Sequence, residues 1–325
     1  MTLALATDEL TKDYAIGFWR KRPYRALDRL TIGVNAGEVF GFLGPNGAGK
    51  TTTLKLLMQL VYPTAGRAEM LGRAVGDLDV KRRIGYLPEN PYFYDHLTAE
   101  ELLTYFAGLF GYDAHERRAR ASRLLDKVGI GAERRLQLRK FSKGMLQRVG
   151  IAQALINDPE LVILDEPMSG LDPLGRRDVR TLILELRDRG CTVFFSSHVL
   201  SDAEALCDRV AILARGRLAA QGRLTEMLAF RARGWELIVA GASDAAIERI
   251  RTAARRVVRI GEGRYSLELP LEPPPEALLG QLTMTGAQLV SLNPLRETLE
   301  DFFVQQVNAP ELTATDRFAP VSRTT

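Results

Sequence analysis

A glycine-rich segment between an apolar run and a helical pattern constrains this chain more than any other feature. Residues 44–51 read Gly-Pro-Asn-Gly-Ala-Gly-Lys-Thr, which fits the pattern G-x-x-x-x-G-K-[ST], and the apolar run Val39–Leu43 precedes them. From Lys50 to Val61, apolar side chains recur at helical spacing. We therefore expect a strand, a phosphate-binding loop and a helix in this order.

The residue types in this loop suit the phosphates of a nucleotide. Glycines let the backbone approach phosphate oxygens because no Cβ intrudes, and the backbone N–H groups and the helix N-terminus face the anion. We expect Lys50 to bind the β- and γ-phosphates of ATP and the Thr51 hydroxyl to face Mg²⁺. The strand-loop-helix context disfavours the alternative of a plain glycine-rich turn. The predicted phosphate-binding residues are Gly44, Pro45, Asn46, Gly47, Ala48, Gly49, Lys50, Thr51 and Thr52.

An acidic pair follows a second apolar run. Leu161-Val-Ile-Leu164 is followed directly by Asp165 and Glu166, and the end of a buried strand is where α/β sheets carry their chemistry. We expect Asp165 to hold Mg²⁺ directly or through water. Glu166 is expected to orient or deprotonate the attacking water. An acidic pair after a strand is common, so the phosphate loop upstream is what favours the functional interpretation over a plain strand end.

Apolar runs alternate with helical patterns along the first two thirds of the chain. This alternation predicts an α/β fold, with a parallel sheet covered on both faces and an inserted helical subdomain. Thr98 and Glu101 form a capping-box pattern that opens a helix through Phe110. The expected elements are strands within 3–10, 25–43, 161–164 and 192–195, a helix over 174–189, and a helical stretch over about 95–157.

The composition changes after residue 228. The order of the expected elements is β-α-β-β-α-β, which predicts a small α+β ferredoxin-like module. Residues 308–325 lack periodicity and are predicted to be a disordered tail. We therefore expect a large domain over 1–228, a small domain over 229–307 and the tail. Within the small domain the expected strands are 235–239, 256–260, 264–269 and 287–292, and the expected helices are 243–254, 275–284 and 295–307.

The composition favours a globular protein of the cytosol. Apolar residues make up 46% and charged residues 26% of the chain, and no run reaches the roughly 18 apolar residues of a membrane span. The N-terminus lacks a basic region and meets Asp8, so a secretory signal is not expected. Any attachment to a membrane is expected to come through a partner. Cys191 and Cys207 are expected to be small buried apolar residues.

The positive charge of the chain is modest. The formal net charge is +4, which permits contact with nucleic acid or lipid without arguing for either. The densest basic stretch, Gly17–Arg25, mixes aromatic and positive residues. A solvated loop between two strands is the favoured interpretation, with a nucleic-acid or membrane contact as the alternative.

Five further motifs accompany the loop and the acidic pair within about residues 3–228. Taken together, the motifs resemble those of the ATP-binding subunits of ABC transporters. The resemblance implies a P-loop NTPase cassette with a mostly parallel core sheet, an antiparallel β subdomain and an inserted helical subdomain. In chain order they are Lys12-Asp-Tyr14, Tyr86-Leu-Pro-Glu89, Phe141-Ser-Lys-Gly-Met145, Ser169-Gly-Leu-Asp172 and Ser196-Ser-His198.

The resemblance implies roles for these residues. Residues 142–145, which are Ser142, Lys143, Gly144 and Met145, stand at the signature and would contact the γ-phosphate held by a second cassette. Ser142 is expected as a helix N-cap, and an ordinary capped helix would explain this serine but not Gly144. His198 would donate a hydrogen bond to the γ-phosphate. Asp172 stands in the D-loop, where its alternative role is to cap the helix ahead of Pro173.

The chain departs from the family pattern in three places. Lys143 replaces a glycine and Met145 a glutamine of the signature, and Lys143 is expected to add positive charge beside the γ-phosphate. Glu89 replaces the usual glutamine of the Q-loop, where it is a candidate Mg²⁺ ligand and catalytic residue with the different pKa behaviour of a carboxylate. Tyr14 is the first candidate for stacking on adenine. The stretch after it is longer than is typical, so Phe18, Trp19 and Tyr24 are the alternatives.

The closing segment Leu295–Phe303 and the sequences of the cassette motifs resemble those of exporters of the ABC-2 type, whose membrane subunit is a separate chain. The resemblance implies a homodimer or paired cassette that hydrolyses ATP with Mg²⁺ and drives that permease from the cytoplasmic face of the membrane. Tyr92-Phe-Tyr94 either docks the permease or packs in the helical subdomain.

Two other functions compete with this interpretation. An ABC-type ATPase acting on ribosomes or DNA is disfavoured because the chain has one phosphate loop and one signature, and lacks a long coiled coil or a cysteine cluster. No nucleic-acid partner is therefore expected. A small-molecule kinase with the same loop would not explain the signature or His198.

Overall fold

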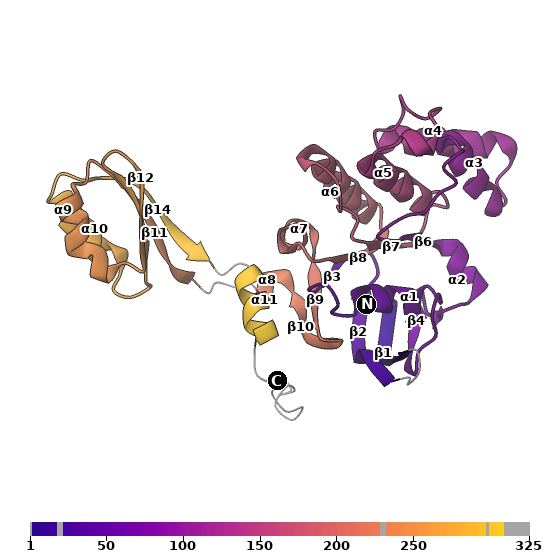
Figure 1. Ribbon diagram of the computed structural model, residues 1–325, viewed down its shortest axis with the longest axis horizontal. Helices are drawn as coiled ribbons and strands as arrows, with labels where there is room; N and C mark the ends of the chain where they lie inside the picture. The colour runs from indigo at the N-terminus through magenta and orange to yellow at the C-terminus, as the bar shows by residue number, and fades with distance from the viewer. Residues whose placement is uncertain (1, 18–21, 228–231, 297–298, 309–325) are drawn as a thin grey trace. The chain divides into compact units, whose positions relative to one another are not determined.

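The chain divides into two compact units, Met1–Leu224 and Thr225–Thr325 (Figure 1). The computed structural model describes residues 2–17, 22–227, 232–296 and 299–308.

A six-stranded sheet forms the centre of the first unit, in the order β10-β9-β3-β8-β7-β6. The strands from β9 to β6 in this order run parallel, and β10 pairs antiparallel with β9. Every residue of β3, β7 and β8 is buried, which is why each of these strands contains a continuous apolar run. The predicted parallel sheet is confirmed. The strands are β3 (Val39–Leu43), β6 (Ile84–Leu87), β7 (Leu161–Asp165), β8 (Thr192–Ser197), β9 (Arg209–Ala214) and β10 (Arg217–Arg223).

A separate antiparallel sheet has the order β2-β1-β4-β5. Its strands are β1 (Leu3–Ile16), β2 (Arg22–Asn35), β4 (Ala65–Met70) and β5 (Arg73–Ala74). The first two are longer than predicted, because β1 and β2 pair with each other along most of their length. The loop predicted over Gly17–Arg25 is therefore wrong for Arg22–Arg25, which belong to β2. Residues 18–21 lie outside the described residues.

Three helices of the first unit form the insertion predicted over about 95–157. They are α3 (Ala99–Leu109), α4 (Ala114–Lys127) and α5 (Lys143–Ala154), and they pack on one another (Figure 1). The capping box is confirmed, because the Glu101 N–H donates to the Thr98 hydroxyl and the Thr98 N–H donates to the Glu101 carboxylate. The remaining helices of this unit are α1 (Lys50–Leu57), α2 (Leu78–Arg83), the 3₁₀ turn η1 (Leu138–Lys140), α6 (Pro173–Asp188) and α7 (Leu200–Leu206), and the short helix α8 (Leu224–Met227) includes the boundary with the second unit.

One hydrophobic core joins both sheets of the first unit to α1. Phe40 of β3 and Phe194 of β8 are fully buried and stack with their ring centroids 5.7 Å apart. Leu54 and Leu57 of α1 belong to the same core. The strand before the phosphate loop and the helix after it are therefore both anchored in the interior.

The second unit contains an antiparallel sheet in the order β12-β13-β11-β14. Helices α9 and α10 contribute Ile247 and Leu278 to a core with Leu237, Leu267 and Leu269 of the sheet. The elements are β11 (Ala232–Ala240), α9 (Asp244–Ile250), η2 (Arg251–Ala253), β12 (Arg256–Gly261), β13 (Arg264–Leu269), α10 (Pro275–Thr283), β14 (Gln288–Arg296) and α11 (Leu299–Asn308).

The end of the second unit differs from the prediction. The closing helix was predicted over 295–307, but residues 295 and 296 pair with β11 as the end of β14, and the helix begins at Leu299. Residues 309–325, which make up nearly all of the predicted tail, lie outside the described residues.

Two other expectations concern membrane-spanning helices and the two cysteines. None of the helices formed by the described residues is both long and apolar enough to cross a bilayer. Cys191 is buried, and burial raises the pKa of its thiol to about 11. Cys207 is half-buried as a residue, but burial raises the pKa of its thiol well above the usual value, so the expectation of a buried side chain is confirmed for both cysteines.

Candidate functional site

A cavity of about 330 Å³ lies over the loop that joins β3 to α1. Its size falls within the range of small-molecule sites. Seven of the nine predicted phosphate-binding residues line it, whereas Gly44 and Ala48 do not. Its lining residues are Tyr14, Tyr24, Ala26, Pro45, Asn46, Gly47, Gly49, Lys50, Thr51, Thr52, Glu89 and Glu166.

Glycine is required at two positions of this loop. A Cβ at Gly44 would lie 2.5 Å from the carbonyl oxygen of Leu213 in β9, so the loop approaches the neighbouring strand too closely for a side chain. Gly49 has a φ of +106°, and a Cβ there would lie 2.6 Å from the carbonyl oxygen of Ala26. The backbone therefore wraps tightly before it enters α1.

The ammonium group of Lys50 lies between the loop and an acidic side chain. Its Nζ donates to the Gly44 carbonyl oxygen at 2.7 Å and lies 3.5 Å from Glu166 Oε1. Both side chains are almost fully buried. A buried charge must be paired, and here the two residues that were predicted to serve the phosphates and the attacking water balance each other.

The acidic pair is held by the adjacent strand β8. Ser196 Oγ donates to Asp165 Oδ1 at 2.5 Å, and the Glu166 N–H donates to the Ser196 carbonyl oxygen at 3.2 Å. Burial raises the pKa of Asp165, the hydrogen bonds from Ser196 and Thr51 oppose that rise, and the charges of Glu89 and Glu166 add to it. Asp165, Thr51 and Glu89 are therefore neighbours at one end of the sheet.

Glu166 has an unusual backbone conformation. Its φ is +51°, which a residue with a side chain rarely adopts. The Gln147 side chain of α5 supports this turn, because its Nε2 donates to the carbonyl oxygens of Glu166 and Pro167 at 3.2 Å each. Strain of this kind persists only where the surrounding structure enforces it.

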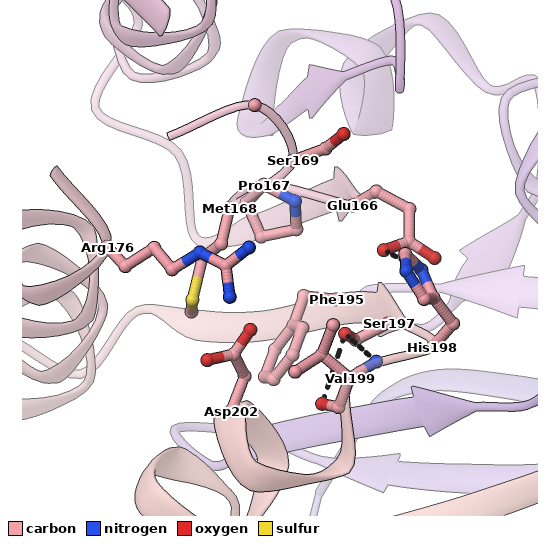
Figure 2. A pocket seen from close by; sticks show the side chains of 11 residues that line it. Glu166, Pro167, Met168, Ser169, Arg176, Phe195, Ser197, His198, Val199 and Asp202 are labelled. Atoms are coloured by element: carbon pink, nitrogen blue, oxygen red, sulfur yellow. Dashed lines mark hydrogen bonds and ion pairs between the residues drawn. The ribbon is translucent and has the colours of Figure 1, made fainter. Parts of the chain in front are cut away.

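His198 contacts the same carboxylate from the other side. Its Nδ1 lies 2.9 Å from Glu166 Oε2, and Figure 2 shows the imidazole and the carboxylate facing each other. The Glu166 side chain therefore lies between Lys50 and His198. The expectation that Glu166 and His198 share one site agrees with this arrangement.

Two tyrosines occupy the side of the cavity formed by the antiparallel sheet. Tyr14 and Tyr24 are register partners on β1 and β2, and both line the cavity. The Lys12 ammonium lies 5.1 Å from the centre of the Tyr14 ring, at a distance typical of a cation–π contact. Of the other candidates for adenine stacking, Phe18 and Trp19 lie outside the described residues.

The signature residues begin helix α5 and lie apart from this cavity. Ser142 is the N-cap and accepts the Met145 N–H at 3.2 Å. The stem of Lys143 lies against Gly170, where an added Cβ would be 3.0 Å from Lys143 Cδ. None of Ser142, Lys143, Gly144 and Met145 is among the described residues that line the cavity of their own chain.

Two alternatives from the sequence can be compared with the structure. Asp172 is the N-cap of α6, where it accepts the Gly175 N–H at 2.8 Å, so the capping role is confirmed, while its role in the D-loop stays a prediction. Tyr92 and Tyr94 are 95% and 58% exposed, which rules out core packing for these two side chains. Phe93 between them is half-buried.

Sequence reasoning missed Gln147 and Ser196. Gln147 is 1% exposed, and a buried amide on an otherwise apolar helix face was the available signal. Ser196 stands in the motif that contains His198, but nothing in that motif indicates a bond to Asp165.

The oxygen donors near Asp165 fit Mg²⁺ better than a metal that needs a full set of protein ligands. Thr51, Asp165 and Glu89 supply only hard oxygen atoms. The described residues contain no group of three or more His, Cys, Asp or Glu side chains spaced for a metal ion. Mg²⁺ is usually held by one or two protein groups, with phosphates and water as its other ligands.

Known proteins are similar to this chain in sequence and in fold. A family model for ABC transporters matches residues 27–169. An ABC transporter ATP-binding protein of Synechocystis sp. is 46% identical over 309 residues, which cover 94% of this chain and 85% of that protein. The bacitracin transport ATP-binding protein BcrA of Bacillus licheniformis is 43% identical over 221 residues, or 67% of this chain and 69% of BcrA.

Solved structures agree with these relatives. The ATP-binding cassette MJ0796, as a dimer in a post-hydrolysis state bound to ADP and Pi, aligns with a TM-score of 0.63 and 26% identity over 68% of this chain and 98% of that chain. An ATP-binding subunit of another ABC transporter aligns with a TM-score of 0.62 and 34% identity over 70% of this chain and 92% of its own. With the phosphate loop, the acidic pair and the cassette fold, these similarities show that the chain belongs to the ATP-binding subunits of ABC transporters and is an ABC-type ATPase.

Proposed function

We propose that this chain is the motor subunit of an exporter, in which two cassettes hydrolyse ATP with Mg²⁺ to drive a separate membrane permease. The observation that carries the proposal is the position of Glu166. Its carboxylate lies 3.5 Å from the Lys50 ammonium and 2.9 Å from His198 Nδ1, beside the cavity over the phosphate loop.

This geometry suits hydrolysis of the γ-phosphate. The loop N–H groups and Lys50 bind the phosphates, and Glu166 takes a proton from the attacking water. The water oxygen then bonds to the γ-phosphorus as the bond to the bridging oxygen of the β-phosphate breaks, which yields ADP and inorganic phosphate. His198 is held by Glu166 in a position to donate to the γ-phosphate. Thr51 and Asp165, with Glu89 beside them, would hold Mg²⁺, which supplies charge neutralisation to the phosphates when bound.

The nucleobase is assigned to the antiparallel sheet. Tyr14 and Tyr24 line the same cavity as the phosphate loop, and the aromatic ring of either can stack on adenine. Tyr14 remains our first candidate because the Lys12 contact holds its ring.

The signature is assigned to the partner cassette. Ser142 and Gly144 begin a helix of 12 residues, whose N-terminus favours an anion, yet they do not line the cavity of their own chain. A two-fold pair of identical chains would bring each signature to the other's γ-phosphate. The dimeric MJ0796 cassette supports such a pair.

Export through a separate permease is supported by the relatives and by one exposed surface. Besides the bacitracin transport protein, a fluoroquinolones export ATP-binding protein of Mycobacterium tuberculosis is 42% identical over 202 residues. Tyr92 and Tyr94 are exposed aromatic side chains suited to docking the permease, which would hold the chain on the cytoplasmic face of the membrane. No observation favours a nucleic-acid partner.

We also propose that the second domain, about 229–307, is a ferredoxin-like module. Its β-α-β-β-α-β order and the strand order β12-β13-β11-β14 support this assignment. Residues 309–325 are proposed as a tail, whereas residue 308, where the predicted tail began, belongs to α11.

The test uses a chain that binds ATP without turning it over. Glu166→Gln keeps the shape of the side chain and removes its basicity, so it should bind ATP, stall hydrolysis and shift from monomer with ADP toward dimer with ATP. The mass is measured by analytical ultracentrifugation with each nucleotide. Near-normal ATP turnover by this variant would remove Glu166 from the role of base.

A second substitution separates the shared site from the nucleotide site. Adding Ser142→Arg to the Glu166→Gln chain should block the dimer while ATP binding by the monomer is retained. Thr283→Arg adds the same charge at an exposed residue, the last of α10 in the second domain, and should leave the dimer intact. Full ATPase activity in a chain with Ser142→Arg alone would overturn the shared-site mechanism.

A further inference from the structure

A second cavity of about 110 Å³ adjoins the nucleotide cavity. Glu166 lines both of them. The rest of the second cavity comes from residues 167–170, from α6 through Arg176, and from the segment that contains His198 and Asp202 (Figure 2). It has room for several waters or one small oxyanion and is too small for a nucleotide.

The charged side chain that distinguishes this cavity is Arg176. Figure 2 shows it extending from α6 into the cavity, on the side opposite Glu166 and His198. Its guanidinium forms no hydrogen bond or ion pair with any described residue, although the side chain is partly enclosed. A guanidinium with five N–H donors is the side-chain group best suited to bind a phosphate through two parallel hydrogen bonds.

The two carboxylates of the cavity are already engaged by other cations. Glu166 pairs with Lys50 and contacts His198. Asp202, which is buried, forms an ion pair with Arg180. The positive charge of Arg176 is therefore not cancelled within the cavity, and an incoming anion finds a cation without first breaking an ion pair. Ser169 also lines the cavity.

We propose that this cavity is a second phosphate subsite, in which Arg176 binds inorganic phosphate after hydrolysis. The inference rests on the proposed function, because the phosphate comes from the γ-position next to Glu166. Phosphate that moves past Glu166 into this cavity leaves ADP behind on the loop. Arg176 is in this sense a product-binding residue, with no part in the cleavage of the bond.

The experiment measures how inorganic phosphate inhibits the full-length ATPase and how it binds to the ADP-loaded chain in equilibrium dialysis. Arg176→Gln removes one charge-assisted pair of hydrogen bonds, so the inhibition constant and the dissociation constant for phosphate should both rise about tenfold or more. The KM for ATP should change by less than about twofold, since Arg176 does not line the nucleotide cavity. Arg176→Lys should lie between the wild type and Arg176→Gln, because a lysine keeps the charge and loses the fork.

Arg177→Gln is the matched control. It removes the same charge from the next residue of α6, which is exposed and does not line the cavity, and it should leave both phosphate constants unchanged. Equal phosphate constants in Arg176→Gln and the wild type would overturn the subsite while leaving the ATPase proposal intact. A wild-type chain that does not hydrolyse ATP would overturn the proposed function, and the dialysis would still decide the subsite, because it uses only ADP and phosphate.

Discussion

Replacing Gln147 by leucine should loosen the turn that carries Glu166. Gln147 is buried on α5, and its side-chain nitrogen donates to the carbonyl oxygens of Glu166 and Pro167 at 3.2 Å each. Leucine has nearly the same size but no donor. The change therefore leaves two buried carbonyl groups without these partners and fills the space with apolar atoms.

The magnitude follows from these two bonds. A buried acceptor that loses its partner costs about 1–3 kcal/mol, and a length of 3.2 Å is at the long end for an N–H···O bond. The Glu166 carbonyl keeps the Ser169 N–H as a partner at 3.0 Å. Taking about 1.5 kcal/mol for the Pro167 carbonyl and about 0.5 kcal/mol for the Glu166 carbonyl gives a loss of about 2 kcal/mol in the free energy of unfolding of the first unit. For a unit of this size the loss lowers Tm by about 4–8 °C. Because Glu166 is held at positive φ by this support, kcat should fall several-fold while ATP binding is retained.

Differential scanning calorimetry and steady-state ATPase rates measure both effects. Gln153→Leu is the control, since Gln153 lies on the same helix, is partly exposed and forms no side-chain hydrogen bond with a described residue. This control should keep Tm within about 2 °C of the wild type, as ordinary surface substitutions do. If Gln147→Leu lowered neither Tm nor kcat beyond the control, the buried amide would have no role in holding the Glu166 turn.

Three other substitutions test separate parts of the molecule. Lys50→Ala should weaken ATP binding at least about tenfold, because it removes the cation of the loop; unchanged affinity for a fluorescent ATP analogue would contradict this role. Thr98→Ala removes the capping box of α3 and should cost about 1 kcal/mol in urea unfolding, whereas Thr104→Ala inside the helix should cost less. Phe194→Ala removes a fully buried ring that stacks on Phe40 and should cost about 3–5 kcal/mol; a loss below about 1 kcal/mol would refute its place in the core.

The phosphate loop could be predicted because it is continuous in sequence. Its glycines, Lys50 and Thr51 act through local backbone geometry, and the strand and the helix that flank it are visible as an apolar run and a helical stripe. The capping box of α3 is equally local. For the same reason the ends of the central strands were predicted to within a few residues, since a strand buried on both faces is apolar along its length.

Long-range contacts could not be predicted in the same way. The bond from Ser196 to Asp165 depends on the pairing of β7 with β8, and the bond from Gln147 to the Glu166 turn depends on how α5 packs. The meeting of Tyr14 and Tyr24 requires the register of β1 and β2. These partners are separated along the chain, and the strand pairing and helix packing that bring them together leave no periodic signal in the sequence.

The ends of the helices and strands also depend partly on local sequence and partly on long-range contacts. A pattern of apolar residues predicted a helix over 295–307, yet residues 295 and 296 extend β14, because pairing with β11 satisfies their backbone. Likewise Arg22–Arg25 are polar enough for a loop and still form a strand, because β1 offers them a partner. Local chemistry sets what a segment can become, and the hydrogen-bonding partner that the fold provides sets where the segment begins and ends.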